Sequence, residues 1–457
     1  MNETNKAIGN YRWTICGLLF FATTINYLDR QVLSLLAPSL SKEFNWSNSD
    51  YANITAVFQF VYAFSMLFAG RLIDKMGTKW GYILAIIIWS LGAIMHAYAI
   101  PIGGVFSNVL TWVGLSAVPI SIAGFMLSRA VLGFGESGNF PAAIKATAEY
   151  FPKKERSFAT GIFNSGSNIG AILAPLTVPW IAVNWGWQSA FIIIGAIGFI
   201  WMFFWFVFYE KPEKQKRLSQ SELAYINAEH GAEVEIKEVS GEEKITWVKL
   251  LGYRQTWAFV FGKFMTDGIW WFFLFWLPKY LEAQFGMVKT DIVFPIAVLY
   301  SMTMIGSIGG GWFPVYFIKK GYTPYDGRMK AMLLIACFPM VVLLAQPLGY
   351  ISFWIPVLLI GVGASAHQAW SANIFTTVSD MFPKKAIGSV IGIGGMAGGI
   401  GGVLVTKLGG ALFDHYEALG HIQTGYSIMF VICAVAYLIA WGVMKALVPK
   451  YSPITDL

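Results

Sequence analysis

Long apolar segments separated by short polar connections are the dominant pattern of this chain. A helix that crosses a lipid bilayer needs about 20 mostly apolar residues. Segments of this kind lie at 13–37, 51–72, 80–100, 122–148, 157–181, 188–209, 257–284, 291–318, 328–348, 353–380, 386–413 and 423–448. The pattern therefore predicts an all-α integral membrane protein with twelve transmembrane helices.

One apolar stretch, 101–121, does not fit this pattern because Pro101, Gly103, Gly104 and Pro119 interrupt it. We expect it to form an extra outer loop or a re-entrant element between the third and fourth spans. If it crossed the membrane, every later helix would be inverted.

Basic residues in the connections favour twelve spans over thirteen. Lysine and arginine are concentrated in the cytoplasmic loops of membrane proteins. The connections after spans two, four, eight and ten carry them, whereas 101–121, 182–187 and 414–422 contain none. In a twelve-span arrangement these four connections all lie on one side, so we expect both termini in the cytoplasm.

The longest polar stretch, 210–256, divides the spans into six and six. It carries charges of both signs and few apolar residues, which is typical of a linker with at most one short helix. We therefore expect a six-helix bundle at 1–209, a cytoplasmic linker at 210–256 and a second six-helix bundle at 257–457. Such a division is typical of transporters built from two structural repeats.

Composition excludes several classes of protein. Hydrophobic residues make up 56% of the chain and charged residues only 12%, against about 25% charged residues in soluble proteins. The net charge of +7 is explained by the loop charges, so nucleic-acid binding is not expected. Cys16, Cys337 and Cys433 all lie in apolar runs, and neither a metal site nor a cofactor is expected. The glycine-rich stretch 392–402 follows no strand, so it is not a dinucleotide-binding motif, and we do not expect an enzyme.

The connection after the second span resembles the loop signature of the major facilitator superfamily. It reads GRLIDKMGTK, with Gly70, Asp74, Gly77 and Lys79 at the expected spacing. Further stretches resemble the anion:cation symporter family within that superfamily. The fourth span and its exit, 129–156, carry residues of its signature, namely Arg129, Gly133, Glu136, Pro141, Phe151, Pro152, Glu155 and Arg156.

Two more segments, 26–38 and 262–281, are similar to the bacterial sugar-acid branch of that family, especially the hexuronate transporters. The resemblance covers essentially the whole chain. It departs at 101–121, which is longer than usual, and at 392–402, which carries no asparagine.

The resemblance implies two six-helix bundles and proton-coupled symport of a sugar-acid anion into the cytoplasm by alternating access. A hexuronate such as galacturonate or glucuronate is the first candidate substrate, and an aldonate or an aldarate such as galactonate or glucarate is the alternative. The coupling ion is inferred to be a proton, with Na⁺ left open. A membrane sensor that does not transport is the alternative from another class. We expect a monomer in a bacterial inner membrane, surrounded by lipid.

Ionisable residues inside the spans are the strongest functional candidates, because each costs several kcal/mol at the bilayer centre on some scales. Tyr27 and Arg30 are three residues apart and share a helix face. The guanidinium fork of Arg30 suits a carboxylate, so we expect Arg30 to bind the substrate anion and Asp29 to titrate during transport. The alternative is a structural ion pair with another helix.

In the fourth span, Arg129, Gly133, Glu136 and Phe140 fall on one helical stripe. Burial favours the protonated form of a carboxyl group, whereas a nearby arginine opposes it. We therefore expect Glu136 to take part in proton coupling. Arg129 is expected to orient Glu136 or attract the anion, with a helix-packing role as the alternative.

Other candidates fall into three groups. The resemblance implies an inner-gate charge network at Arg71, Asp74, Lys79, Glu149 and Arg156. The remaining predicted substrate-binding residues are Tyr62, Asn164, Trp271, His367, Gln368, Trp370 and Ser371. Lys263 and Asp267 are spaced to neutralise each other, and Lys407 is expected either to snorkel outward or to add positive potential.

Overall fold

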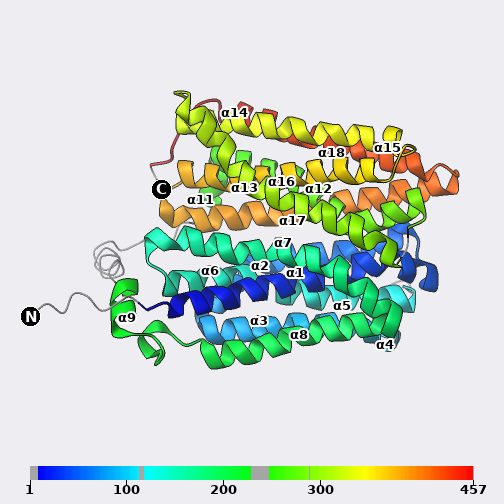
Figure 1. Cartoon of the computed structure of the whole chain (residues 1–457), viewed down its shortest axis with the longest axis horizontal. Coiled ribbons are helices and arrows are strands. Elements are labelled where there is room, and N and C mark those ends of the chain that lie inside the picture. Colours follow the sequence, from blue (N-terminus) through cyan, green and yellow to red (C-terminus); the bar gives the residue numbers. More distant parts are fainter. Residues whose placement is uncertain (1–8, 113–117, 228–245, 288, 456) are drawn as a thin grey trace, which may run out of the picture.

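The structure is a computed structural model that describes residues 9–112, 118–227, 246–287, 289–455 and 457. These residues are almost entirely helical, and no strand occurs among them. The helices run side by side along one long axis, with those of the first half of the chain grouped below those of the second half in Figure 1. The first half contains α1 (Tyr11–Phe44), α2 (Asn48–Met76), α3 (Thr78–Met95), η1 (His96–Tyr98), α4 (Ala99–Trp112), α5 (Ile120–Glu136), α6 (Asn139–Tyr150), α7 (Lys153–Trp185) and α8 (Trp187–Phe208).

The second half contains α12 (Arg254–Phe285), η3 (Lys289–Ile292), α13 (Val293–Lys319), α14 (Pro324–Cys337), η4 (Phe338–Leu344), α15 (Ala345–Leu348), α16 (Trp354–Met381), α17 (Lys384–Ala418) and α18 (Ile422–Leu447). Between the halves lie the short helices η2 (Pro212–Lys214), α9 (Gln220–Asn227) and α11 (Trp247–Leu251).

Nine helical segments in the described part of the chain are long and apolar enough to cross a membrane. Three further units complete the twelve predicted spans: α1, α16 and the interrupted pair α5 and α6. These three units carry the buried polar residues Arg30, His367 and Glu136. Polar residues inside a span reduce its hydropathy, which explains why these three units are less apolar than the other nine.

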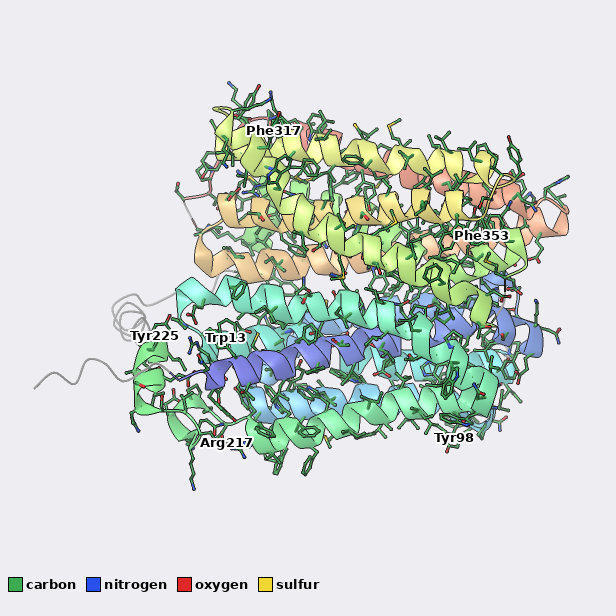
Figure 2. The ribbon with its side chains drawn as sticks, in the orientation of Figure 1. Trp13, Tyr98, Arg217, Tyr225, Phe317 and Phe353 are labelled. Atoms are coloured by element: carbon green, nitrogen blue, oxygen red, sulfur yellow. The ribbon has the colours of Figure 1, made fainter. Side chains whose placement is uncertain are left out.

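The two ends of the bundle are distinguished by the chain termini. α1 begins and α18 ends at the same end of the bundle (Figure 1), which we call the termini face. The opposite end, where α1 finishes at Phe44 and α2 begins at Asn48, is called the distal face. Aromatic side chains mark both ends, with Trp13 near the termini face and Tyr98 and Phe353 near the distal face (Figure 2). Such aromatic belts are typical of membrane–water interfaces.

The expectation of a loop or re-entrant element at 101–121 is wrong for the residues that the structure describes. α3, η1 and α4 run on as one helix to Trp112, while 113–117 lie outside the described residues. Gly103 of α4 packs directly on the backbone of Ile120, and Gly124 of α5 packs on the backbone of Ala99. The glycines that suggested a loop therefore allow two helices to approach closely.

The predicted fourth span, 122–148, is two helices rather than one. α5 ends at Glu136 and α6 begins at Asn139. Pro141 has no backbone N–H for the carbonyl four residues earlier, and its ring would clash with that carbonyl in a continuous helix. Phe140 consequently does not continue the stripe of Arg129, Gly133 and Glu136. Glu136 is the last residue of α5, and this helix end is buried inside the bundle.

Candidate functional site

A buried ion pair joins α1 to the end of α5. Arg30 donates from Nη2 to Oε2 of Glu136 at 2.7 Å and from Nε to the same oxygen at 2.9 Å. The two side chains are only 4% and 0% exposed. The break in the fourth span places the Glu136 carboxylate here, because the chain turns away at Ser137 instead of covering it with another helical turn.

Close packing between α1 and α7 holds Arg30 in place. Gly170 of α7 lies against the backbone carbonyl of Thr24 and the Cβ atom of Tyr27, and Gly166 lies one turn away against the carbonyl of Phe20. A pair of glycines four residues apart lets two helix backbones approach closely within a membrane. The site face of α1 is therefore fixed by contacts on its other side.

Four aromatic rings surround the Arg30 guanidinium. Its central carbon lies 4.7 Å from the ring centroid of Tyr27, 4.9 Å from Tyr62, 5.2 Å from Trp271 and 5.3 Å from Phe58. These distances are in the range of cation–π attraction. Tyr27, Tyr62 and Trp271 were predicted site residues, whereas Phe58 was missed. Its position four residues before Tyr62 is the sequence signal that places it on the same face.

This group of rings around Arg30, the aromatic cage, is shared between the two halves of the chain. Tyr27 belongs to α1, Phe58 and Tyr62 to α2, and Trp271 to α12. A group bound against Arg30 would therefore touch both halves at once.

Arg129 of α5 binds the backbone of α1 at Arg30. Its Nη1 and Nη2 atoms both donate to the backbone carbonyl of Arg30 at 3.3 Å, and its guanidinium carbon lies 5.2 Å from the ring of Phe58. The side chain is fully buried. The Glu136 carboxylate is paired with Arg30, so whether Arg129 orients Glu136, attracts the anion or only packs the helices stays a prediction.

Asp29 is buried beside this ion pair without hydrogen bonds of its own. Neither of its carboxylate oxygens has a hydrogen-bond partner among the described residues, and the same holds for Oε1 of Glu136. Glu136 is close enough to act on Asp29 electrostatically. The amide nitrogens of Asn26 and Gln31 are also buried without partners in the described chain. Buried polar groups are normally satisfied, so this cluster is an unusual concentration of unused hydrogen-bonding capacity.

The expected pairing of Lys263 with Asp267 is confirmed. Their Nζ and Oδ2 atoms are 2.7 Å apart, one turn apart on α12. Trp271, one further turn along the same face, is the residue that reaches the aromatic cage. The pair therefore lies on the face of α12 that also carries Trp271 to the Arg30 site.

His367 and Trp370 lie deeper within the second half of the chain. His367 Nδ1 is 2.9 Å from the hydroxyl of Tyr437, and its ring stacks on Trp270 with centroids 5.1 Å apart. Trp370 meets the ring of Tyr437 edge-on at 5.6 Å. The structure thus gives these two side chains packing partners on α12 and α18 and does not place them in the aromatic cage.

The other predicted substrate-binding residues have less distinctive surroundings. Gln368 and Ser371 of α16 are half-buried, and Asn164 of α7 is exposed. Lys407 of α17 donates to the side-chain oxygen of Asn53 on α2, so it joins the two halves instead of extending freely outward. A substrate role for Gln368, Ser371 and Asn164 stays a prediction.

The predicted gate residues have separate partners at the termini face. Asp74 pairs with Lys145 at 2.8 Å and Lys79 with Glu210 at 2.9 Å. The hydrogen bond from Lys79 holds the pKa of the Glu210 carboxyl below its usual range. These partners all belong to the first half of the chain or its exit, so the contacts described here tie helices within one half.

The other three predicted gate residues are Glu149, Arg71 and Arg156. Glu149 accepts a hydrogen bond from Thr78 at 2.7 Å and another from Tyr209. Arg71 lies over the ring of Trp247 in the linker helix α11, with 6.0 Å to the centroid. The side chain of Arg156 lies outside the described part of the structure. A gating role for these residues therefore stays a prediction.

Polar contacts at the distal face join the two halves directly. Asp414 of α17 accepts hydrogen bonds from the backbone amides of Asn48 and Ser49, at 2.6 and 2.8 Å. The first amides of a helix have no partner within it, so Asp414 caps α2 from the other half. Glu417 accepts from the Asn48 side chain at 2.7 Å, and Lys279 donates to the same side chain at 3.1 Å. We call this group the distal latch; sequence analysis did not identify it.

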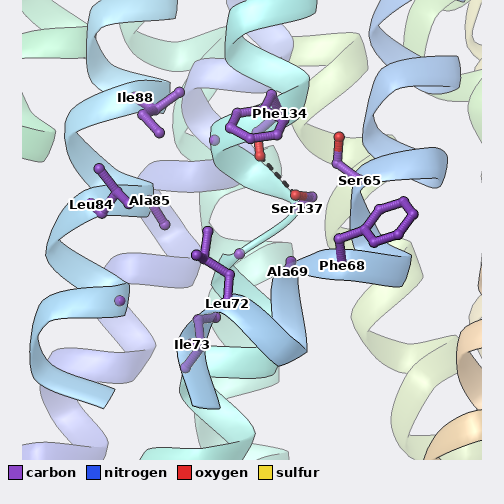
Figure 3. A pocket seen from close by; sticks show the side chains of 13 residues that line it. Ser65, Phe68, Ala69, Leu72, Ile73, Leu84, Ala85, Ile88, Phe134 and Ser137 are labelled. Carbon is purple, nitrogen blue, oxygen red and sulfur yellow. Dashed lines mark hydrogen bonds between the residues drawn. The ribbon is translucent and has the colours of Figure 1, made fainter. Parts of the chain in front are cut away.

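An apolar pocket lies apart from these polar groups, between α2, α3 and α5 (Figure 3). Phe68, Leu72 and Phe134 belong to its lining and are exposed. Ser65 and Ser137 contribute the polar side chains of its lining, and the Ser137 hydroxyl donates to the Phe134 carbonyl at 2.7 Å. The pocket contains none of the predicted site residues, and its lining suits the lipid-facing surface.

Comparisons with known proteins agree with this architecture. The hexuronate transporter of Escherichia coli (strain K12) is 31% identical over 452 residues, which cover 96% of this chain and 95% of the relative. The galacturonate transporter of Dickeya chrysanthemi is 32% identical over 312 residues, covering 68% and 84%. A bacterial homologue of the human lysosomal transporter Spinster, solved in an inward-facing and occupied conformation, has the same fold, with a TM-score of 0.71, 18% identity and coverage of 96% and 97%.

A family model matches residues 19–406 and is described as the Major Facilitator Superfamily. The match spans most of the chain and includes all of the aromatic cage, the ion pair and the loop signature after α2. This chain therefore belongs to the major facilitator superfamily, a family of membrane transporters rather than enzymes.

Proposed function

We propose that this protein is a proton-coupled symporter that carries a sugar-acid anion, a hexuronate such as galacturonate or glucuronate, into the cytoplasm. The observation that carries the proposal is the position of Arg30, buried at the junction of the two halves and enclosed by aromatic rings from both. The relatives named for hexuronate and galacturonate transport support the choice of substrate.

The substrate carboxylate would bind the guanidinium of Arg30. The planar fork of arginine matches the two oxygens of a carboxylate, and the rings of the cage offer flat apolar surfaces to a sugar ring. In the structure Glu136 holds this fork at 2.7 Å. Substrate and Glu136 therefore compete for the same cation.

This competition supplies a reason for proton coupling. When the substrate takes Arg30, Glu136 is left as a buried carboxylate without its counter-ion, which is strongly unfavourable in a dry site. Taking up a proton removes that cost. Asp29, buried nearby without a hydrogen-bond partner among the described residues, is the second group that can hold the proton.

Alternating access would follow from movement of the bundle at 1–209 against the bundle at 257–457, with 210–256 as linker. The distal latch and the Lys42–Glu282 ion pair, at 2.5 Å, join the two halves at the distal face and would have to separate when that face opens. We place the termini face in the cytoplasm of a bacterial inner membrane, because the basic loops lie on that side. The transporting unit is taken to be a monomer in lipid.

Uptake by liposomes that contain the purified protein tests the proposal. Labelled galacturonate should accumulate against its gradient when the outside is made acidic, and a Na⁺ gradient at constant pH should not drive it. Accumulation of galactonate or galactarate in place of galacturonate would favour the aldonate or aldarate alternative. Binding of a sugar acid without any exchange across the membrane would support a sensor and contradict the proposal.

A further inference from the structure

One face of α12 carries three residues at four-residue spacing, Lys263, Asp267 and Trp271. Residues spaced in this way stack along one side of a helix. The ring centroid of Trp271 lies 5.2 Å from the guanidinium carbon of Arg30. Asp267 lies close enough to Tyr27 to act on it electrostatically. The face therefore looks into the Arg30 site from the second half of the chain.

The rise of an α-helix sets the spacing along this face. At 1.5 Å per residue, Asp267 lies about 6 Å and Lys263 about 12 Å from Trp271, towards the termini face. A six-carbon acid held at Arg30 and lying along α12 is longer than one helical turn. Its far end would therefore meet Asp267 before it meets Lys263.

The Lys263–Asp267 pair is built into the wall of the site. Its Nζ–Oδ2 distance is 2.7 Å, and the side chains are 7% and 17% exposed. Gly398 of α17 packs directly on the Asp267 carboxylate, and Gly402 packs on Trp271. A side chain at Gly398 would take the space that Asp267 occupies, so the glycine on α17 lets the acid remain beside its lysine.

The two ion pairs at the site differ in what they offer an anion. Glu136 can release Arg30 because a neighbouring carboxylate, Asp29, shares its surroundings and a proton can neutralise either one. Lys263 is held by an acid on its own helix, at a fixed spacing of one turn. Arg30 is thus available to the substrate, whereas Lys263, near the substrate's far end, is already paired with Asp267.

We propose that Asp267 is a specificity-determining residue: by occupying Lys263 and facing the far end of the substrate, it restricts the site to acids with a single carboxylate. Hydroxyl groups at that end can donate hydrogen bonds to Asp267, whereas a second carboxylate is repelled by it. The inference rests on the proposed function and selects among its candidate substrates, favouring hexuronates and aldonates over aldarates.

Equilibrium binding to the purified full-length protein tests this inference, with galacturonate and galactarate as probes at one pH. The natural protein should bind galacturonate at least tenfold more tightly than galactarate. Asp267→Asn leaves Lys263 free, and the ratio of the two affinities should shift at least tenfold towards galactarate. The double variant Lys263→Gln with Asp267→Asn is the matched control. It removes both charges, so it relieves the repulsion without freeing a lysine and should gain less galactarate binding than Asp267→Asn does.

The outcomes separate this inference from the proposed function. If the natural protein binds no hexuronate, the proposed function fails. If it binds galacturonate and galactarate equally, or if Asp267→Asn keeps the natural ratio, only the role of Asp267 is overturned. Should Asp267→Asn not fold, Lys263→Gln answers the same question. An unpaired Asp267 should reject galactarate more strongly than before, and an unchanged ratio in that variant would also overturn the inference.

Discussion

Arg30 of α1 and Glu136, the last residue of α5, form an ion pair with 2.7 Å between Nη2 and Oε2 and with almost no exposure to solvent. Removing one partner of such a buried pair costs about 3–5 kcal/mol, because the other charge is left uncompensated. The charge of each residue is therefore stabilised by the charge of the other. In the proposed function, an anion that binds the Arg30 guanidinium would leave Glu136 without its counter-ion, and uptake of a proton by Glu136 would remove that cost.

The first prediction concerns the anion. Arg30→Gln should lower the affinity for galacturonate at least a hundredfold, because the charge and the fork are both lost. Arg30→Lys should restore little of it, since lysine keeps the charge without the planar pair of donors. Titration calorimetry on the purified protein measures both. Arg217→Gln, which alters an exposed arginine over the ring of Phe208, is the control and should bind normally. Near-normal binding by Arg30→Gln would remove this residue from the site.

The second prediction concerns coupling. Glu136→Gln imitates the protonated carboxyl permanently, so the protein should still load substrate and exchange labelled for unlabelled galacturonate. It cannot release the proton, so accumulation driven by a pH gradient should vanish. Counterflow and pH-driven uptake in one liposome preparation measure the two activities. Asp29→Asn should act in the same direction if the two carboxylates form one relay.

A variant that is merely misfolded would lose counterflow as well as uptake. Preserved counterflow is therefore the internal control. Full gradient-driven accumulation by Glu136→Gln would contradict the assignment and shift coupling to Asp29.

The third prediction concerns the distal latch. Asp414→Asn weakens the cap that α17 places on α2, and loss of a charged cap costs about 1–2 kcal/mol. That free energy corresponds to a change of about 5- to 30-fold in the ratio of closed to open protein. A cysteine introduced at Asn53, below the latch, should react correspondingly faster with an impermeant thiol reagent added at the distal face.

Asp50→Asn is the matched control for this experiment. Asp50 caps the same end of α2, but it bonds to Ser47 of its own half, at 2.9 Å from the Ser47 amide. Its loss weakens the helix end without touching the contact between halves. Equal acceleration by both variants would show that the latch is only a local cap.

The fourth prediction concerns the helix that replaces the expected loop at 101–121. A methyl group at Gly103 would overlap the backbone of Ile120, whereas one at Gly104 would meet nothing within 4 Å. Gly103→Ala should therefore lower the free energy of unfolding by about 1–3 kcal/mol, the cost typical of overpacking. The melting temperature of the purified protein should fall accordingly. Gly104→Ala should leave it unchanged. Equal melting temperatures for the two variants would indicate that α4 does not pack on α5.

The number of spans and the chemistry of the site are readable from the sequence. The bilayer requires about 20 apolar residues for each crossing. Hydropathy identifies nine of the twelve predicted spans in the described part of the chain, and the other three are recognisable as apolar segments that carry polar residues. Any ionisable residue inside a span is costly enough to stand out, and Asp29, Arg30 and Glu136 were recognised in this way. The Lys263–Asp267 pair was also predictable, because both partners lie on one helix at a fixed spacing.

Partners on different helices were decided only by the tertiary structure. Glu136 is paired with Arg30 rather than with Arg129 of its own helix, and Trp271 faces the cage while its neighbour Trp270 turns to His367. Asp414 reaches α2 from more than 360 residues away in the chain. Helical periodicity tells which residues share a face, but the partner of that face depends on how each helix is rotated and how closely it packs. Here glycines such as Gly170 and Gly398 set those approaches, and their effect exists only once the neighbouring backbone is in place.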